Sequence, residues 1–262
     1  MSKVFTIFRQ CVQAIRDGEL IEREGRNDKE FHFQNWFQKR LQSLGLKFDM
    51  PGRNSYPDFR LVHFPEGYEI KGLAYPGREA SYDSNSQVPC GEHNGRQIFY
   101  VFGRYPREPD GNSYPVLDLV LCHGSFLNAD NDYVHHNKSF RGFGTYGDIL
   151  VRDRKMYVCP TPFALTSGTA HRRTLIVPEN YQIESGFIEV GTLTRREAEQ
   201  MVVAYSFDLR TNELATTQVP NPNAGRAHVF KALRVEGDPT DAVTLRDHSQ
   251  VLLELAPDAN ED

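Results

Sequence analysis

The sequence predicts an α/β protein of the α+β-like kind, in which helices flank a central mixed β-sheet. Two helical patterns occupy the first 44 residues, and the chain then changes to short strand-like runs. Links rich in Gly, Pro, Asn and Asp separate these runs, without a regular alternation of strands and helices. With 262 residues, 39% of them hydrophobic, the chain is long enough to bury a substantial core.

Apolar residues at helical spacing predict two N-terminal helices. The first covers about Lys3 to Asp17, and the second begins near Asn27 or Asp28 and runs to Leu44. Glu30 lies three residues before the apolar stripe of the second helix, where an unpaired carboxylate would be costly to bury. Glu30 therefore lies just beyond the core edge or faces a site that uses it. The apolar stripe itself consists of Phe33, Phe37, Leu41 and Leu44.

Strand-like runs cover most of the remaining chain. A Thr-x-x-Glu capping box at Thr194 and Glu197 also predicts a third helix. We expect residues 1–165 to form the core and residues 166–262 to extend it or to form a small second domain, with an acidic tail after residue 236. The third helix would carry Ala198, Met201, Val202 and Tyr205 on one face. The expected strands are 57–64, 68–73, 97–104, 116–122, 148–152, 155–159, 174–177, 186–190, 203–209, 213–219 and 228–235.

Charge is distributed unevenly along the chain, whose formal net charge is −5. The segment 236–262 contains eight acidic residues and one basic residue, so residues 1–235 have 29 basic and 27 acidic side chains, a net charge of +2. Between Lys138 and Arg173, seven basic side chains stand against Asp148 and Asp153. That local excess would suit a phosphate-binding face, and a solvated basic surface would give the same count.

The composition also limits where the protein works. No apolar run approaches the roughly eighteen residues of a membrane-spanning helix, and the N-terminus lacks the apolar segment of a secretory signal. The four cysteines form no C-x-x-C pair, which is typical of a reduced compartment and gives no zinc-site spacing. We expect a cytoplasmic protein of bacterial type that does not associate with membranes.

The most informative feature is a hairpin motif in which Pro57-Asp58 is followed by Glu69-Ile70-Lys71. Side chains alternate along a strand, so Glu69 and Lys71 share one face. A turn centred tightly on Pro65 and Glu66 would place Asp58 opposite Leu73, too far from Glu69. A shared site requires Asp58 to lie opposite Glu69, with the turn nearer residues 62–65, or a bulge that bends the strands.

Two carboxylates and an ammonium group on one face suggest chemistry on phosphate. Asp58 and Glu69 are hard oxygen ligands suited to Mg²⁺, which takes one or two carboxylates and keeps several waters. The ion would neutralise phosphate charge and activate a water molecule, and Lys71 would orient that water and stabilise the developing charge. The alternative is a surface hairpin on which Glu69 and Lys71 form an ordinary exposed pair.

The motif Pro57-Asp58…Glu69-Ile70-Lys71, preceded by a helix that bears Glu30, resembles the PD-(D/E)XK nuclease superfamily, and most closely its type II restriction endonucleases. The resemblance covers roughly residues 25–105. It implies a restriction-endonuclease-like core and Mg²⁺-dependent hydrolysis of double-stranded DNA to 5′-phosphate and 3′-hydroxyl ends. It also implies metal ligation by Asp58, Glu69 and the backbone carbonyl of Ile70, catalysis by Lys71, and a supporting carboxylate from Glu30.

The resemblance further implies a sequence-specific enzyme of a restriction system that acts as a homodimer, because such enzymes commonly cut palindromes with two-fold symmetry. Residues 166–262 would then supply dimer contacts or DNA recognition. Two alternatives stay open. One is a structure-selective repair or recombination nuclease, and the other is a non-catalytic DNA-binding protein.

Two long links contain side chains of the types that read base edges. Arg60 and Arg104, on predicted strands, would contact phosphate or pair with acids. A second acid-x-Lys pattern, at Asp153-Arg154-Lys155, has only four residues between it and Asp148, too few for two paired strands. The base-reading candidates are Arg78, Asn85, Gln87, His93, Asn94 and Arg96 in link 74–96, and His136, Asn137, Lys138 and Arg141 in link 123–147.

Overall fold

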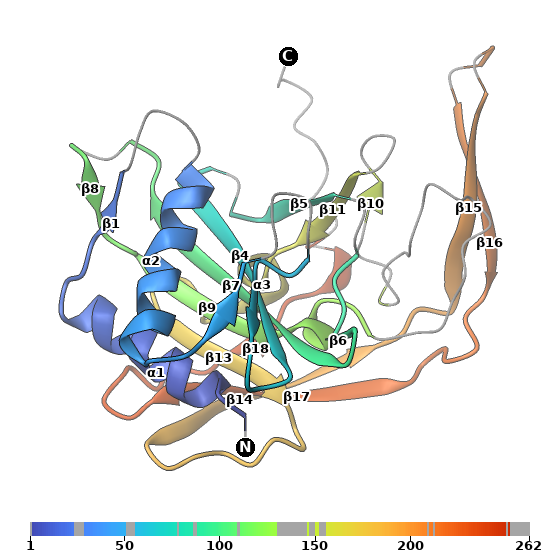
Figure 1. Cartoon of the computed structure of the whole chain (residues 1–262). Helices are drawn as coiled ribbons and strands as arrows, with labels where there is room; N and C mark the ends of the chain where they lie inside the picture. Colours follow the sequence, from blue (N-terminus) through green and yellow to red (C-terminus); the bar gives the residue numbers. More distant parts are fainter. Residues whose placement is uncertain are drawn as a thin grey trace.

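The computed structural model consists of a nine-stranded mixed sheet with two long helices on one face (Figure 1). This architecture confirms the predicted class at the level of helices combined with a central mixed sheet. Within the helices and strands, the side chains of residues 29–30, 85, 150–151, 156–157, 202–207 and 214 are not described. The structure describes residues 2–23, 29–50, 56–77, 79–85, 88–108, 111–129, 146, 150–151, 156–208, 210–211, 213–249 and 251.

The central sheet has the strand order β14-β17-β13-β9-β7-β4-β3-β2, and β6 (Glu92–His93) pairs with β7 beside it. The pairs β4/β7 and β9/β13 are parallel, and the other neighbours are antiparallel. Three of these strands lie beyond residue 165, so the C-terminal part of the chain continues the same sheet. The strands are β2 (Phe48–Asp49), β3 (Phe59–Leu61), β4 (Glu66–Tyr75), β7 (Arg96–Pro106), β9 (Asp118–His123), β13 (Arg173–Pro178), β14 (Phe187–Arg196) and β17 (Ala227–Val235).

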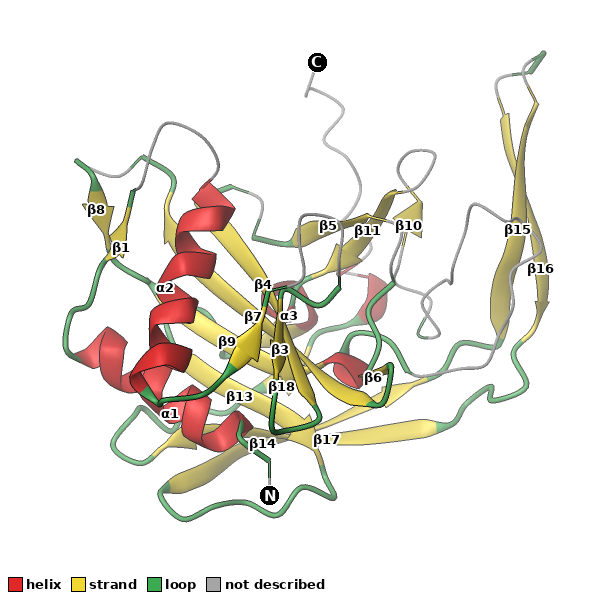
Figure 2. Cartoon of the chain, viewed as in Figure 1, coloured by secondary structure: helices red, strands yellow, loops and turns green. Residues whose placement is uncertain are grey.

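Helices α1 (Val4–Arg16) and α2 (Lys29–Ser43) confirm the two N-terminal predictions and cover one face of the sheet (Figure 2). On β4 this face carries Tyr68 and Ile70, which share a buried apolar cluster with both helices. Helix α2 packs closely because β7 has a glycine at position 103. A Cβ atom on Gly103 would lie 2.1 Å from Cζ of Phe33, so no larger residue fits without displacing that ring.

The opposite face of β4 carries Glu69, Lys71 and Leu73, because side chains alternate along a strand. A second buried cluster covers the central strands here, and it includes Tyr82, Tyr100 and Phe102. The covering elements are a small sheet, β10 (Leu150–Val151), β11 (Met156–Pro160) and β5 (Ser81–Asn85), with the short helices η1 (Gly124–Phe126) and α3 (Pro162–Leu165). Two further small pairs are β1 (Ile21–Glu22) with β8 (Ser113–Tyr114), and β12 (Thr166–Ser167) with β18 (Thr244–Leu245).

The predicted third helix is wrong. Thr194 belongs to β14, which pairs with β17 from Phe187 to Arg196, so the neighbouring strand satisfies the backbone groups that a helix would have bonded internally. Glu197 caps no helix: its carboxylate is buried, accepts a hydrogen bond from Asn221 and lies 2.7 Å from Nε2 of His228. After it, β15 (Gln200–Asp208) and β16 (Glu213–Pro220) form a hairpin that projects from the body (Figure 1).

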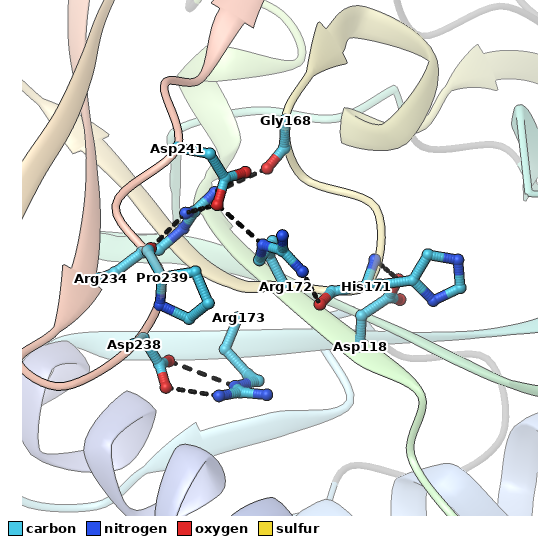
Figure 3. Close-up of polar contacts among 9 residues, drawn as sticks. All are labelled: Asp118, Gly168, His171, Arg172, Arg173, Arg234, Asp238, Pro239 and Asp241. Carbon is cyan, nitrogen blue, oxygen red and sulfur yellow. Dashed lines mark hydrogen bonds and ion pairs between the residues drawn. The ribbon is translucent and has the colours of Figure 1, made fainter.

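Acidic residues after position 236 fold back onto arginines of the body (Figure 3). Asp238 binds Arg173 and also Arg16, whose NH2 lies 2.8 Å from Oδ1 of the carboxylate. Asp241 binds Arg172 at 2.9 Å and Arg234 at 3.0 Å. Burial opposes ionisation of Asp238, but hydrogen bonds from Arg173 and Arg16 outweigh it and lower the pKa of this carboxyl.

This arrangement corrects the charge argument made from sequence. The excess of basic residues between positions 138 and 173 includes Arg172 and Arg173. Both of them form ion pairs with acidic residues of the segment 236–262, which the sequence analysis treats as a separate acidic tail. Opposite charges distant in sequence neutralise each other in space, so a count along the chain overstates the local field. None of the described helices is long and apolar enough to cross a membrane.

Candidate functional site

The hairpin motif adopts the register that a shared site requires. Strands β3 and β4 pair Phe59 with Tyr68 and Arg60 with Gly67. Continued by one residue, this register places Asp58 opposite Glu69, and not opposite Leu73 as a tight turn at Pro65–Glu66 would. A residue distant in sequence holds the turn: NH1 of Arg96 donates hydrogen bonds to the carbonyl oxygens of Leu61 and Phe64.

Asp58, Glu69 and Lys71 lie together at the end of this hairpin that is away from its turn. The backbone amide of Ile70 donates to Oδ2 of Asp58 at 2.8 Å, and the backbone amide of Asp58 donates to Oε2 of Glu69 at 3.3 Å. Nζ of Lys71 lies 3.0 Å from Oε1 of Glu69. The side chains of Glu69 and Lys71 are only 14% and 17% exposed, so this is not the fully solvated pair that a surface hairpin would show.

A wall of tyrosines borders the two carboxylates. Tyr100 is the β7 neighbour of Glu69, and its hydroxyl lies 2.8 Å from that of Tyr56. The ring of Tyr82 lies 5.9 Å from Nζ of Lys71. Burial raises the pKa of all three phenols well above the ordinary value, and the nearby Glu69 carboxylate adds to the effect. The wall therefore stays uncharged and lowers the effective dielectric constant beside the carboxylates.

A second cationic side chain lies on β3. Arg60 comes two residues after Asp58, which precedes the strand, and its Nε is buried without a hydrogen-bond partner among the described residues. Burial and the Arg60 guanidinium together lower the pKa of His93, whose ring contacts Tyr56 edge-on at 5.0 Å. Lys71 therefore supplies a cation in contact with Glu69, and Arg60 supplies a second cation near His93.

The donor set fits Mg²⁺ better than a transition metal. Among the described residues, no group of three or more His, Cys, Asp and Glu could hold a metal ion, and the donors that the hairpin offers are the carboxylates of Asp58 and Glu69. Two carboxylates suffice for an ion that keeps most of its waters. The ammonium of Lys71 occupies the position beside Oε1 of Glu69 that a cation would need. An ion bound at Oε1 would therefore compete with Lys71 for Glu69.

Glu30 begins from the other side of the sheet. Its helix α2 packs on the Tyr68 face of β4, whereas Glu69 and Lys71 extend from the opposite face. The side chain of Glu30 is outside the described part of the structure, and its role stays a prediction, as does that of the Ile70 carbonyl.

Few of the base-reading candidates lie in the described chain. Arg96 fixes the hairpin turn, and Asn94 contacts Nε2 of the neighbouring His93 at 3.0 Å. Arg104 pairs with Asp118 through buried hydrogen bonds of 2.9 and 3.0 Å from its Nε, so it binds an acid and is not available to phosphate. Arg78, Gln87, His136, Asn137, Lys138 and Arg141 lie outside the described residues, and Asn85 is described only by its backbone in β5.

Sequence reasoning missed the tyrosine wall. Tyr100 could have been placed by its two-residue alternation with Ile98 and Phe102 on a predicted strand. Tyr82 could not, because β5 was not predicted and its position depends on pairing with β11.

The hairpin and its surroundings are the basis for inferring a function. Comparisons of the chain with protein-family models, curated protein sequences and solved structures gave no match.

Proposed function

We propose that the protein is a Mg²⁺-dependent endonuclease for double-stranded DNA, of the PD-(D/E)XK kind and sequence-specific like the type II restriction enzymes. The observation that carries this proposal is the register of β3 and β4, which places Asp58 opposite Glu69 on the face that also carries Lys71. A hairpin that served only as structure would have no reason to desolvate two acids and a lysine together.

The side chains have distinct tasks in this proposal. Asp58 and Glu69 hold the Mg²⁺ ion, which neutralises phosphate charge and makes a bound water a better nucleophile at neutral pH. Lys71, once displaced from Glu69, donates hydrogen bonds to a phosphate oxygen or to the attacking water. The tyrosine wall excludes bulk solvent, which strengthens the attraction between carboxylates and ion. Arg60 contacts a phosphate next to the scissile one.

The proposal is tested by incubating the purified full chain with supercoiled plasmids, and with branched and damaged DNA, in Mg²⁺ or in EDTA. Discrete linear fragments with 5′-phosphate and 3′-hydroxyl ends of one sequence are expected in Mg²⁺ alone. Cleavage restricted to branched or damaged substrates would replace the restriction class by a repair class. No cleavage of any of these substrates would reject the nuclease.

Matched variants separate the site from general effects on folding. Asp58→Asn, Glu69→Gln and Lys71→Met should each lower the cleavage rate by about a hundredfold or more while DNA binding stays measurable. An exposed ion pair serves as the control: Lys39 of α2 lies 2.9 Å from Glu22 of β1, and their side chains are 47% and 63% exposed. Lys39→Met and Glu22→Gln should leave cleavage unchanged.

A further inference from the structure

A second candidate site lies at the other end of the central sheet. A cavity of about 450 Å³ opens where β14 ends, and its lining includes Arg195, Arg196 and Arg246. In the strand order, β7, β9, β13 and β17 lie between β4 and β14. Five interstrand spacings separate the two strands by about 24 Å, so this cavity is not part of the Asp58 site.

The cavity is lined by several basic side chains. Arg195, Arg196 and Arg246 contribute guanidinium groups and His248 an imidazole, and no Asp or Glu is among the described residues that line it. Such a concentration of one sign of charge at a concave surface attracts anions.

Arg195 is held in place before any ligand binds. It is 7% exposed, and its NH1 donates to the carbonyl oxygens of Phe126 and Leu127. Its guanidinium carbon lies 3.9 Å from the ring centroid of Tyr146, whose hydroxyl donates to the carbonyl oxygen of Ser125 at 2.6 Å. These contacts hold the guanidinium in one orientation, so it is preorganised.

The remaining wall is apolar. Leu165, Leu245 and Val251 line the cavity together with Ala198. Its volume lies in the range of about 300–1,000 Å³ found for small-molecule sites and exceeds what a phosphate ion alone would fill. A ligand that satisfies both parts of the wall carries an anionic group on an apolar body.

We propose that this cavity binds a nucleotide unit, with its phosphate against the arginines and its base against the apolar wall. The unit would be a free nucleotide or one nucleotide of a nucleic-acid strand, since the recognised chemistry is the same. The proposal does not depend on the nuclease proposal, because none of Asp58, Glu69 and Lys71 lines the cavity.

Calorimetric titration of the full chain in EDTA tests this site without metal-dependent chemistry. The probes are the four deoxynucleoside 5′-monophosphates, inorganic phosphate and a 5′-phosphorylated single-stranded pentanucleotide. At least one monophosphate should bind about tenfold more tightly than inorganic phosphate. A pentanucleotide that binds tighter still would identify a strand as the ligand, and equal affinity would identify a free nucleotide. Absence of nucleotide binding, or equal binding of inorganic phosphate, would overturn the proposal.

Variants locate the binding. The double variant Arg196→Gln/Arg246→Gln should weaken nucleotide binding by about tenfold or more, because each removes a charge-assisted hydrogen bond. Arg210→Gln removes the same charge from an arginine that is 89% exposed and does not line the cavity, and it should bind like the unaltered protein. Arg195 is left intact because it braces two backbone carbonyls. Equal binding by the double variant, with an unchanged melting temperature, would place the ligand elsewhere.

Discussion

The backbone amide of Asp58 donates a hydrogen bond to the carboxylate of Glu69, while the carboxylate of Asp58 accepts one from the amide next to Glu69. The two acids are therefore fixed relative to each other by main-chain groups of the hairpin, and not by their own rotamers alone. Their mutual repulsion is offset at present by Lys71. Replacing that ammonium by a divalent cation is the exchange on which the following two predictions depend.

Lys71→Met should increase the affinity for Mg²⁺ by several-fold while it abolishes cleavage. The ammonium 3.0 Å from Glu69 competes with the ion for the same oxygen and repels it, so its removal favours metal binding. Calorimetric titration with MgCl₂ measures the affinity, and Lys39→Met serves as the control with the same change of charge. A weaker affinity in Lys71→Met would mean that the lysine does not share the metal position.

Mg²⁺ should stabilise the protein, and Asp58→Asn should remove that stabilisation. A ligand that binds only the folded state at ten times its dissociation constant adds about 1.4 kcal/mol to the free energy of unfolding. Without metal, the variant should be as stable as the unaltered protein or more so, since it relieves repulsion between two acids. Thermal melts with and without 10 mM Mg²⁺, about ten times the dissociation constant of a millimolar site, make the comparison. An equal Mg²⁺-induced shift in both proteins would exclude Asp58 as a ligand.

Acid should destabilise the fold through His123 as the pH falls from about 6.5 to about 4. Burial lowers the pKa of His123 from 6.5 to about 4. The amide of Ser125 donates to Nδ1, so Nε2 carries the proton and donates to Oε1 of Gln97 at 2.8 Å, which leaves the neutral ring fully bonded.

The unfolded chain takes up this proton near pH 6.5 and the folded chain only near pH 4. The contribution of His123 is thus complete above about pH 6.5 and falls by up to about 3 kcal/mol as the pH drops to 4. Denaturant unfolding between pH 7 and 4 should show a flatter profile for His123→Gln. Parallel profiles for the two proteins would show that His123 does not titrate in this way.

Gly103→Ala should destabilise the protein by about 1–3 kcal/mol through overpacking under α2. The added methyl group would lie 2.1 Å from the ring of Phe33, which is fully buried. Denaturant unfolding of the single variants and of Gly103→Ala/Phe33→Leu forms a double-mutant cycle. The second substitution should recover part of the loss in this background, although it destabilises the unaltered protein. Additive effects would show that the two positions do not touch.

Much of the fold could be predicted because its signals are local. Apolar spacing placed α1 and α2 within a few residues, and most long strands coincide with predicted runs. The third helix failed because the capping signal at Thr194 and Glu197 competed with pairing to β17, more than thirty residues away in sequence. Pairing with a strand distant in sequence determined the structure of this segment, and such pairing cannot be derived from a single sequence.

The site, like the fold, could be predicted only where its signals are local. The identities of Asp58, Glu69 and Lys71 follow from their types and spacing, whereas their register depends on Arg96, which holds carbonyl oxygens 35 and 32 positions earlier in the chain. The local turn residues alone would have favoured the tight hairpin with Asp58 opposite Leu73. The observed register is the one in which Asp58 and Glu69 can share a metal ion, and the turn residues alone do not predict it.

The buried guanidinium of Arg234 sets a practical limit on shortening the protein. It is 0% exposed, and it donates to the carbonyl oxygens of Gly168 and Pro239 and binds Asp241. A version that stopped at residue 237 would lose two of these three acceptors and leave a desolvated cation, at a cost of about 3–5 kcal/mol. Any trimmed version intended for crystallisation should therefore end beyond Asp241.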